Sequence, residues 1–172
     1  MTILHIDSSI NGENSASRAI SRSIVDQLRA ANPGADVVTR DLVTEPLPHL
    51  TLDAFADTIV IGAPMYNFTL PTQLKAWLDR ILIAGKTFRY TENGPEGLAK
   101  GKRVVIALAR GGFYDHGSPA SALEHLKTYL TGVFNFIGIE PEFVAADGLA
   151  VSPEQRDTSI KAALGETVRL AA

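Results

Sequence analysis

The stretch TIVIGAPMYNFTLPTQLKAWL, residues 58–78, indicates the fold more clearly than any other part of the chain. Its first seven residues form a nearly continuous apolar run, which is typical of a strand covered on both faces of a parallel sheet. Pro71 suits the first position of a helix, and Leu74, Trp77 and Leu78 then recur at three- and four-residue spacing. The stretch therefore predicts a buried strand, a loop and an amphipathic helix.

The same alternation of strand and helix continues along the chain. Apolar runs predict strands at 3–6, 37–42, 58–64, 104–109 and 142–145, and helical spacing predicts helices at 17–31, 71–82, 123–137 and 153–168. Strands that alternate with helices imply a parallel sheet with helices on both faces. We therefore expect an α/β protein, a single domain over 1–172, with a flavodoxin-like, doubly wound, five-stranded parallel sheet of order 2-1-3-4-5.

Two segments interrupt this regularity. Residues 86–102 are too long for an ordinary helix-to-strand loop and predict a hairpin-like excursion over the surface. Residues 43–57 are short for a crossover between parallel strands, which needs about 10–12 residues and usually a helix. Pro46 and Pro48 leave little room for one here, which favours a missing piece over a complete crossover.

Composition excludes several classes of protein. The 172 residues include no cysteine, which excludes a disulfide scaffold, thiolate metal sites and a catalytic thiol. The net charge of -3, from 16 Lys+Arg and 19 Asp+Glu, argues against nucleic-acid binding, which needs a basic face. No apolar run reaches the ~18 residues of a membrane span, and the N-terminus lacks the basic segment of a signal peptide. We therefore expect a soluble, cytoplasmic protein.

The loop after the first strand is rich in serine and leads directly into a helix. Ser9, Ser15 and Ser17, with Ala16 between the last two, place hydroxyl groups beside the free N–H groups of the helix start. Such a helix N-terminus can hold a phosphate through dipoles. Ordinary helix capping by Ser15 or Ser17 explains the same serines, so both interpretations stay open.

Two further loops follow the third and fourth strands at the same edge of the predicted sheet. The first carries the apolar cluster Met65, Tyr66, Asn67 and Phe68, which either buries a flat ligand or packs on neighbouring loops. The second, residues 109–112, carries two glycines that let backbone N–H groups approach a ligand, or that form a tight turn. Taken together, the three loops offer a phosphate site at the serine-rich loop, an apolar slot at 65–68 and an edge of backbone N–H donors at 109–112. This combination suits a mononucleotide with a large ring, namely FMN.

The chain also resembles a known family over nearly its whole length. The segments that carry the likeness are 8–18, 64–68, 74–79 and TFRYTENGPEGL at 87–98, and the stretches 65–68 and 88–98 are the most specific. They are similar to bacterial FMN-dependent NADH:azoreductases, which also act as quinone reductases and were once described as acyl-carrier-protein phosphodiesterases. The resemblance implies FMN as cofactor, NADH or NADPH as electron donor, quinones and azo compounds as acceptors, and a homodimer.

The resemblance also assigns site residues. The residues that match the family's cofactor-binding positions are Ser9, Ser15, Ala16, Ser17, Met65, Tyr66, Asn67, Phe68, Ala109, Arg110, Gly111 and Gly112. Ala109 replaces the family's usual hydroxyl residue, so only its backbone can take part. Tyr90, Phe113 and Phe134 match the substrate pocket. No side chain is expected to be catalytic, because flavin N5 carries the hydride, and a slot shared by donor and acceptor predicts ping-pong kinetics.

The resemblance has one departure, and two other functions stay open. Family members usually have a longer helical segment between the second and third strands, which helps to wall the active site across a dimer, whereas residues 50–57 join those strands directly. A flavodoxin-type electron carrier is one alternative function. A hydrolase is the other, with Ser9, His116 and Asp115 as a possible triad, although G-x-S-x-G and metal-ligand spacings are absent. The apolar faces of 123–137 also predict a homodimer.

Overall fold

A computed structural model describes residues 1–45 and 56–171 and contains a five-stranded sheet in the order β2-β1-β3-β6-β7. All its neighbouring strands pair in parallel. The strands are β1 (Thr2–Asp7), β2 (Asp36–Asp41), β3 (Thr58–Pro64), β6 (Arg103–Ala109) and β7 (Glu142–Ala146). Because β4 and β5 belong to a separate hairpin, this order is the predicted 2-1-3-4-5, and the predicted strand order is confirmed.

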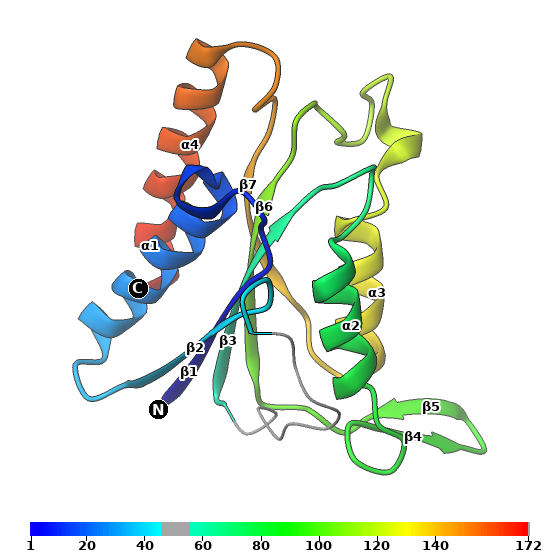
Figure 1. The fold of residues 1–172 in the computed structure, drawn as a ribbon. Coiled ribbons are helices and arrows are strands. Elements are labelled where there is room, and N and C mark those ends of the chain that lie inside the picture. Colours follow the sequence, from blue (N-terminus) through cyan, green and yellow to red (C-terminus); the bar gives the residue numbers. More distant parts are fainter. Residues whose placement is uncertain (46–55, 172) are drawn as a thin grey trace.

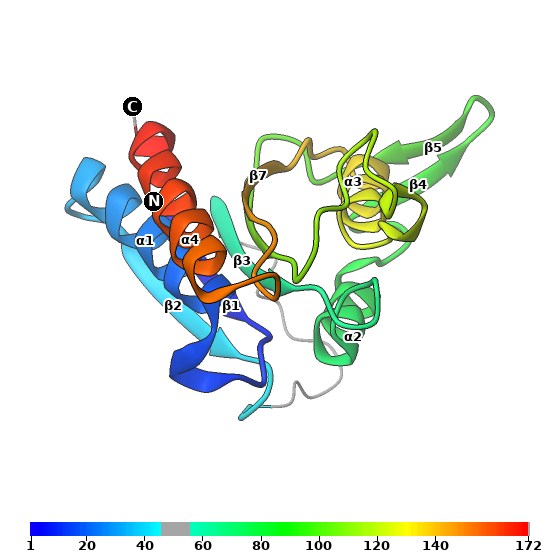
Figure 2. The same cartoon turned by 90° about the horizontal axis from the view of Figure 1, so that it is seen from above.

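Helices cover both faces of the sheet, as Figures 1 and 2 show. One face carries α1 (Ala16–Ala31) and α4 (Pro153–Thr167), and the other carries α2 (Thr72–Ile81) and α3 (Lys127–Phe136). Short 3₁₀ turns lie at Gly12–Asn14 (η1), Ser121–Leu123 (η3) and Val168–Ala171 (η4).

The two cores follow from the alternation of side chains along each strand. Val60 and Val105 pack into the core under α1 and α4, and Ile61 and Ile106 pack into the core under α2 and α3. The parallel register places Val60 opposite Val105 and Ile61 opposite Ile106. Both faces of β3 are therefore apolar, which is why its sequence reads as a continuous hydrophobic run.

The helix expected at 123–137 is wrong at its start, because α3 begins only at Lys127. Leu123 lies in the η3 turn with 42% of its surface exposed. The Glu124 carboxylate accepts hydrogen bonds from the N–H groups of Lys127 and Thr128, at 2.7 and 2.9 Å. A carboxylate is favourable at a helix N-terminus, so Glu124 caps the helix rather than continuing it.

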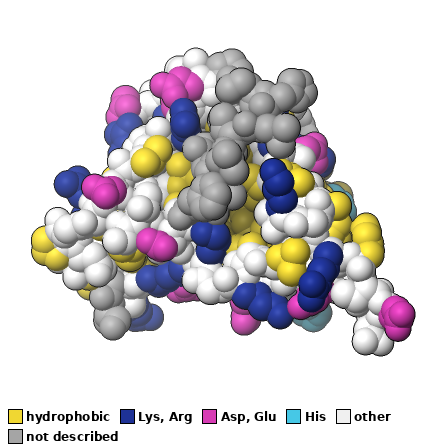
Figure 3. Space-filling model, turned by 90° about the horizontal axis from the view of Figure 1, so that it is seen from below, with side chains coloured by type: hydrophobic (Ala, Val, Ile, Leu, Met, Phe, Trp, Pro, Cys, Tyr) yellow, Lys and Arg dark blue, Asp and Glu magenta, His cyan; other side chains and the backbone are white. Residues whose placement is uncertain are grey.

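The predicted excursion over 86–102 contains an antiparallel hairpin of β4 (Phe88–Thr91) and β5 (Gly94–Gly97). It projects from the end of the molecule where the parallel strands begin (Figure 1). The ring of Phe88 lies 4.7 Å from the ring of Phe136 on α3. Figure 3 views this end and shows Lys and Arg side chains scattered among apolar and acidic ones rather than gathered in one basic patch.

The short connection that the sequence singles out falls largely at residues 46–55, outside the described residues, so the structure does not test that prediction. Within the described part of the chain, no helix combines the length and the apolar character needed to cross a membrane.

Candidate functional site

The loops that follow β1, β3, β6 and β7 meet at the carboxyl edge of the sheet, at the top of Figure 1. Figure 2 looks down on this edge. Ligands of open α/β sheets bind outside the carboxyl ends of the strands, near the point where the strand order reverses. Here that point lies between β1 and β3, which neighbour each other in the sheet.

The loop after β1 presents the start of α1. Ser15 caps this helix, because its Oγ accepts the N–H of Arg18 at 3.3 Å. The Oγ atoms of Ser15 and Ser17 are 3.0 Å apart, and both residues are buried, as is Ala16. Among the described residues, the N–H groups of Ala16 and Ser17 have no protein acceptor. The capping interpretation therefore holds for Ser15, while the helix start keeps two donors for an anion.

The side chain of Arg18 holds this loop in place through hydrogen bonds and ion pairs. Its Nη2 donates to the carbonyl oxygen of Ser9 at 2.9 Å and to Asp41 Oδ2 at 2.8 Å, and Nη1 lies 3.5 Å from Asp7 Oδ2. Burial by itself raises the pKa of Asp41, but the N–H of Val43 and the Arg18 guanidinium bring it below its ordinary value. Sequence reasoning gave Arg18 no such role, because its acidic partners lie on other elements.

The loop after β3 is a tight turn with strained backbone. Tyr66 and Thr69 exchange backbone hydrogen bonds at 2.9 and 3.1 Å. The two residues between them, Asn67 and Phe68, have positive φ angles of 47° and 72°. Non-glycine residues in this region cost of order 1–3 kcal/mol each, and such strain clusters at functional sites. The turn exposes 42% of Phe68, whose ring meets that of Tyr114 edge-on at 6.4 Å.

The first two loops are joined through Tyr66, and the third loop meets the second at Met65. The Tyr66 hydroxyl lies 3.2 Å from Ser9 Oγ and accepts the N–H of Ile10 at 3.3 Å. Met65 packs against the core under α2 and α3, and its N–H donates to the carbonyl oxygen of Ala109 at 2.9 Å. The three loops named from the sequence therefore do meet at one edge.

The loop after β6 offers backbone donors. The carbonyl oxygens of Arg110, Gly111 and Gly112 accept N–H groups from residues 148–150, at 2.9–3.1 Å. Within the described part of the chain, the N–H groups of Gly111 and Gly112 have no protein acceptor. In this loop the three carbonyl acceptors are therefore satisfied, while two N–H donors stay available for a ligand.

The Arg110 side chain turns inward instead of toward the rim, with 1% of its surface exposed. Its Nε and Nη2 donate to the two oxygens of Asp147, both at 2.6 Å, and Nη2 also donates to Asp115 Oδ1 at 2.9 Å. Nη1 lies 3.8 Å from Glu124 Oε1. Burial lowers the pKa of Arg110, but hydrogen bonds to the two aspartates raise it above its ordinary value. Arg110 and Glu124 also line an open hollow of ≈ 410 Å³ with Tyr114 and Lys127.

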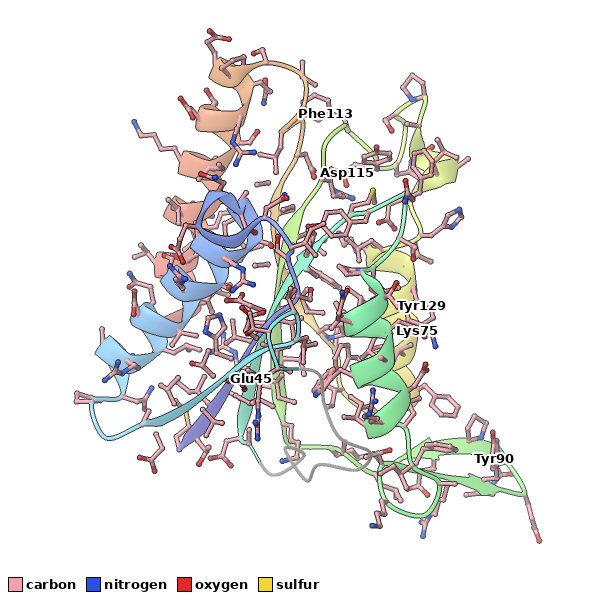
Figure 4. All side chains as sticks on the ribbon, in the orientation of Figure 1. Glu45, Lys75, Tyr90, Phe113, Asp115 and Tyr129 are labelled. Carbon is pink, nitrogen blue, oxygen red and sulfur yellow. The ribbon has the colours of Figure 1, made fainter. Side chains whose placement is uncertain are left out.

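The structure separates the three predicted pocket residues. Phe134 is fully buried in the core under α2 and α3, so it is not at a surface pocket. Tyr90 is 74% exposed on the hairpin, at the opposite end of the molecule from Phe113 and Asp115, as Figure 4 shows. Phe113 alone lies at the expected edge, half exposed, with its ring against Gly148. Helical spacing cannot separate a core aromatic from a pocket aromatic, which explains the error at Phe134.

Two residues of the possible triad, Asp115 and Ser9, have other partners. Asp115 pairs with Arg110, and Ser9 Oγ lies against the Tyr66 hydroxyl. Over residues 1–45 and 56–171, no group of three His, Asp or Glu side chains is arranged to hold a metal ion. The described edge therefore offers hydroxyls, backbone donors and aromatic rings.

Comparison with known proteins identifies the family. A family model described as a flavodoxin-like fold matches residues 1–170. The chain belongs to the flavodoxin-like family. Within it, the chain is 49% identical over 201 residues to the FMN-dependent NADH:quinone oxidoreductase 2 of Bradyrhizobium diazoefficiens, with 100% of both chains covered. The alignment is longer than the 172 residues of this flavodoxin-like chain, so some aligned positions have no residue here.

Solved structures give the same result for this flavodoxin-like chain. The crystal structure of azoreductase AzrA superposes with a TM-score of 0.89 at 27% identity, covering 99% of both chains. An FMN-dependent NADH-azoreductase from Bacillus anthracis, solved in complex with FMN, superposes with a TM-score of 0.83 at 26% identity over 100% of both chains.

Proposed function

We propose that this protein is an FMN-dependent oxidoreductase that passes two electrons from NADH or NADPH to quinones and azo compounds. The observation that carries the proposal is the pair of unused N–H donors at Gly111 and Gly112, on the same edge as the serine-lined start of α1. The printed names of its relatives, which are FMN-dependent NADH:quinone oxidoreductases and azoreductases, support the same activity. The chain acts in this proposal as one FMN-binding domain.

The residues present fit FMN. The hydroxyls of Ser9, Ser15 and Ser17, with the free N–H groups at the start of α1, form a phosphate site made of dipoles. The strained turn at Asn67 and Phe68 supplies an apolar and aromatic wall for a flat ring. Bound there, FMN supplies the two-electron chemistry, and the protein supplies orientation and electrostatics.

The donor edge has a defined task in this proposal. A flavin carries more negative charge at the pyrimidine end of its ring when reduced. The N–H groups of Gly111 and Gly112 would stabilise that charge without any change in protonation. The protein then needs no side-chain acid or base at the ring.

Electron donor and acceptor would use one slot in turn, which gives ping-pong kinetics. Phe113, half exposed beside Gly148, is positioned to contact a ring that enters this slot. Double-reciprocal plots of rate against NADH at several quinone concentrations would then be parallel. Intersecting lines would instead require donor and acceptor to be bound together.

We further propose a homodimer, because Tyr90 can line a pocket only from a second copy. In its own chain the ring lies at the end opposite the site (Figure 4), on the β4–β5 hairpin, with 74% of its surface exposed. Gel filtration at several concentrations should give a dimer, and Tyr90→Ala should raise KM for quinone without changing FMN binding. A persistent monomer would remove this part of the proposal. A cytoplasmic location stays a prediction.

Steady-state NADH oxidation by FMN-loaded protein, with menadione or an azo dye as acceptor, tests the proposal. Turnover that depends on added FMN is the expected result. A protein that binds FMN and turns over poorly would instead be an electron carrier, and one that ignores NADH and cleaves phosphodiesters would be a hydrolase. Either outcome would replace the proposed function.

A further inference from the structure

The loop that carries Gly111 and Gly112 is held against the loop after β7. The N–H of Arg110 donates to the carbonyl oxygen of Ala146 at 2.9 Å, and residues 148–150 donate back to the carbonyls of 110–112. These bonds run along one side of the loop. They leave the N–H groups of Gly111 and Gly112 without a protein acceptor in the described part of the chain.

A buried ion pair connects the same two loops through side chains. Arg110 makes two hydrogen bonds of 2.6 Å to Asp147, whose side chain is 16% exposed. Two parallel bonds between a guanidinium and a carboxylate fix relative orientation as well as distance. The backbone carbonyl oxygen of Asp147 also accepts the hydroxyl of Ser159 on α4, at 2.6 Å, so the backbone that carries this carboxylate is held by a helix.

We propose that Asp147, acting through Arg110, is a positioning residue that sets the redox potential of the bound flavin by fixing the Gly111 and Gly112 N–H donors. The inference rests on the proposed function, since it needs FMN at this edge. Neither Asp147 nor its role follows from any motif in the sequence. The ion pair joins residues that lie 37 positions apart.

The sign of the potential change separates positioning from simple charge. Three carboxylates surround Arg110, so their net field disfavours negative charge on a nearby ring. Removing one carboxylate would therefore stabilise the reduced flavin if charge alone mattered, and the potential would rise. Loosening the donors weakens binding of the reduced flavin more than that of the oxidised flavin, so the potential would fall.

The experiment compares four purified, FMN-loaded proteins by equilibrium reduction against a redox dye: wild type, Asp147→Ala, Asp147→Glu and Asp115→Asn. Asp115 is the matched control, because it bonds the same guanidinium but its side chain is 71% exposed. Asp147→Asn replaces Asp147→Ala if the alanine variant fails to fold, because the amide keeps the shape and one acceptor oxygen.

We expect Asp147→Ala to weaken reduced relative to oxidised FMN binding about tenfold, which lowers the two-electron potential by about 30 mV. Asp147→Glu should restore part of the shift, and Asp115→Asn should leave the potential close to that of wild type. A potential that rises or stays unchanged in Asp147→Ala overturns the inference, as does an equal fall in Asp115→Asn. Wild-type protein that binds no FMN overturns the proposed function itself, a distinguishable result.

Discussion

Replacing Ser17 by alanine should weaken FMN binding about 10- to 150-fold, because a hydrogen bond to a charged group contributes about 1.5–3 kcal/mol. The hydroxyl is fully buried in the first turn of α1, 3.0 Å from Ser15 Oγ. In this position it can reach a phosphate held by the free N–H groups of the helix start. Quenching of FMN fluorescence at fixed ionic strength measures the dissociation constant.

Ser23→Ala is the matched control for this prediction. Ser23 lies on the same helix and loses a comparable hydrogen bond, 2.7 Å to Thr167, away from the site. It should lower stability and leave FMN affinity unchanged. Riboflavin, which lacks the phosphate, should bind Ser17→Ala and wild type equally. If FMN binds Ser17→Ala as tightly as wild type, the start of α1 does not hold the phosphate.

Three other predictions concern stability. Phe134→Ala should lower the free energy of unfolding in urea by about 3–5 kcal/mol, because the ring is fully buried. The control Leu123→Ala should lower it by less than about 1 kcal/mol, because Leu123 is exposed. Equal losses in the two variants would contradict the assignment of Phe134 to the core. Gly97→Ala should destabilise the hairpin and expose it to proteolysis, because the added Cβ would lie 2.1 Å from Gly138 N. Gly132→Ala, where the added Cβ meets no other atom, should instead stabilise α3 by about 0.5–1 kcal/mol. A hairpin that resists proteolysis in Gly97→Ala would refute this packing. Burial alone raises the pKa of Glu124, but its backbone hydrogen bonds hold the pKa below the ordinary 4.5. The capping carboxylate therefore contributes fully to the stability of the fold above pH 4.5, and this stability is lost as the pH falls through the lowered pKa of the folded protein. Glu124→Gln should therefore flatten the fall of the melting temperature in acid, and an unchanged slope would count against the cap.

The sequence predicts the fold well because its signals are local. The run over β3 is apolar on both faces, and the turn from strand to helix at 64–71 carries proline at each end. The sequence places the start of α3 too early, because Leu123 and Leu126 continue the helical spacing. In the structure the Glu124 carboxylate instead caps the helix, by accepting the N–H groups of Lys127 and Thr128.

The site was predictable only where loops follow strands. The serines near α1, the turn at Asn67 and the glycines at 111 and 112 all lie directly after strand ends, which parallel topology brings together. The supporting charges were not predictable, because Arg110 and Asp147 come from different loops and no spacing rule relates them. The hairpin's distance from the site follows from the same topology, because residues 86–102 connect a helix to the next parallel strand and such connections lie at the amino edge of the sheet.

Separate half-reactions test the central claim most directly. Purified protein is reconstituted with FMN, desalted, and mixed anaerobically first with NADH and then with menadione, while its visible absorption spectrum is followed. The account predicts a yellow protein with one FMN per chain, whose absorption is bleached by NADH alone and restored by the quinone. A protein that emerges colourless from desalting, or that keeps its colour in the presence of NADH, would contradict it.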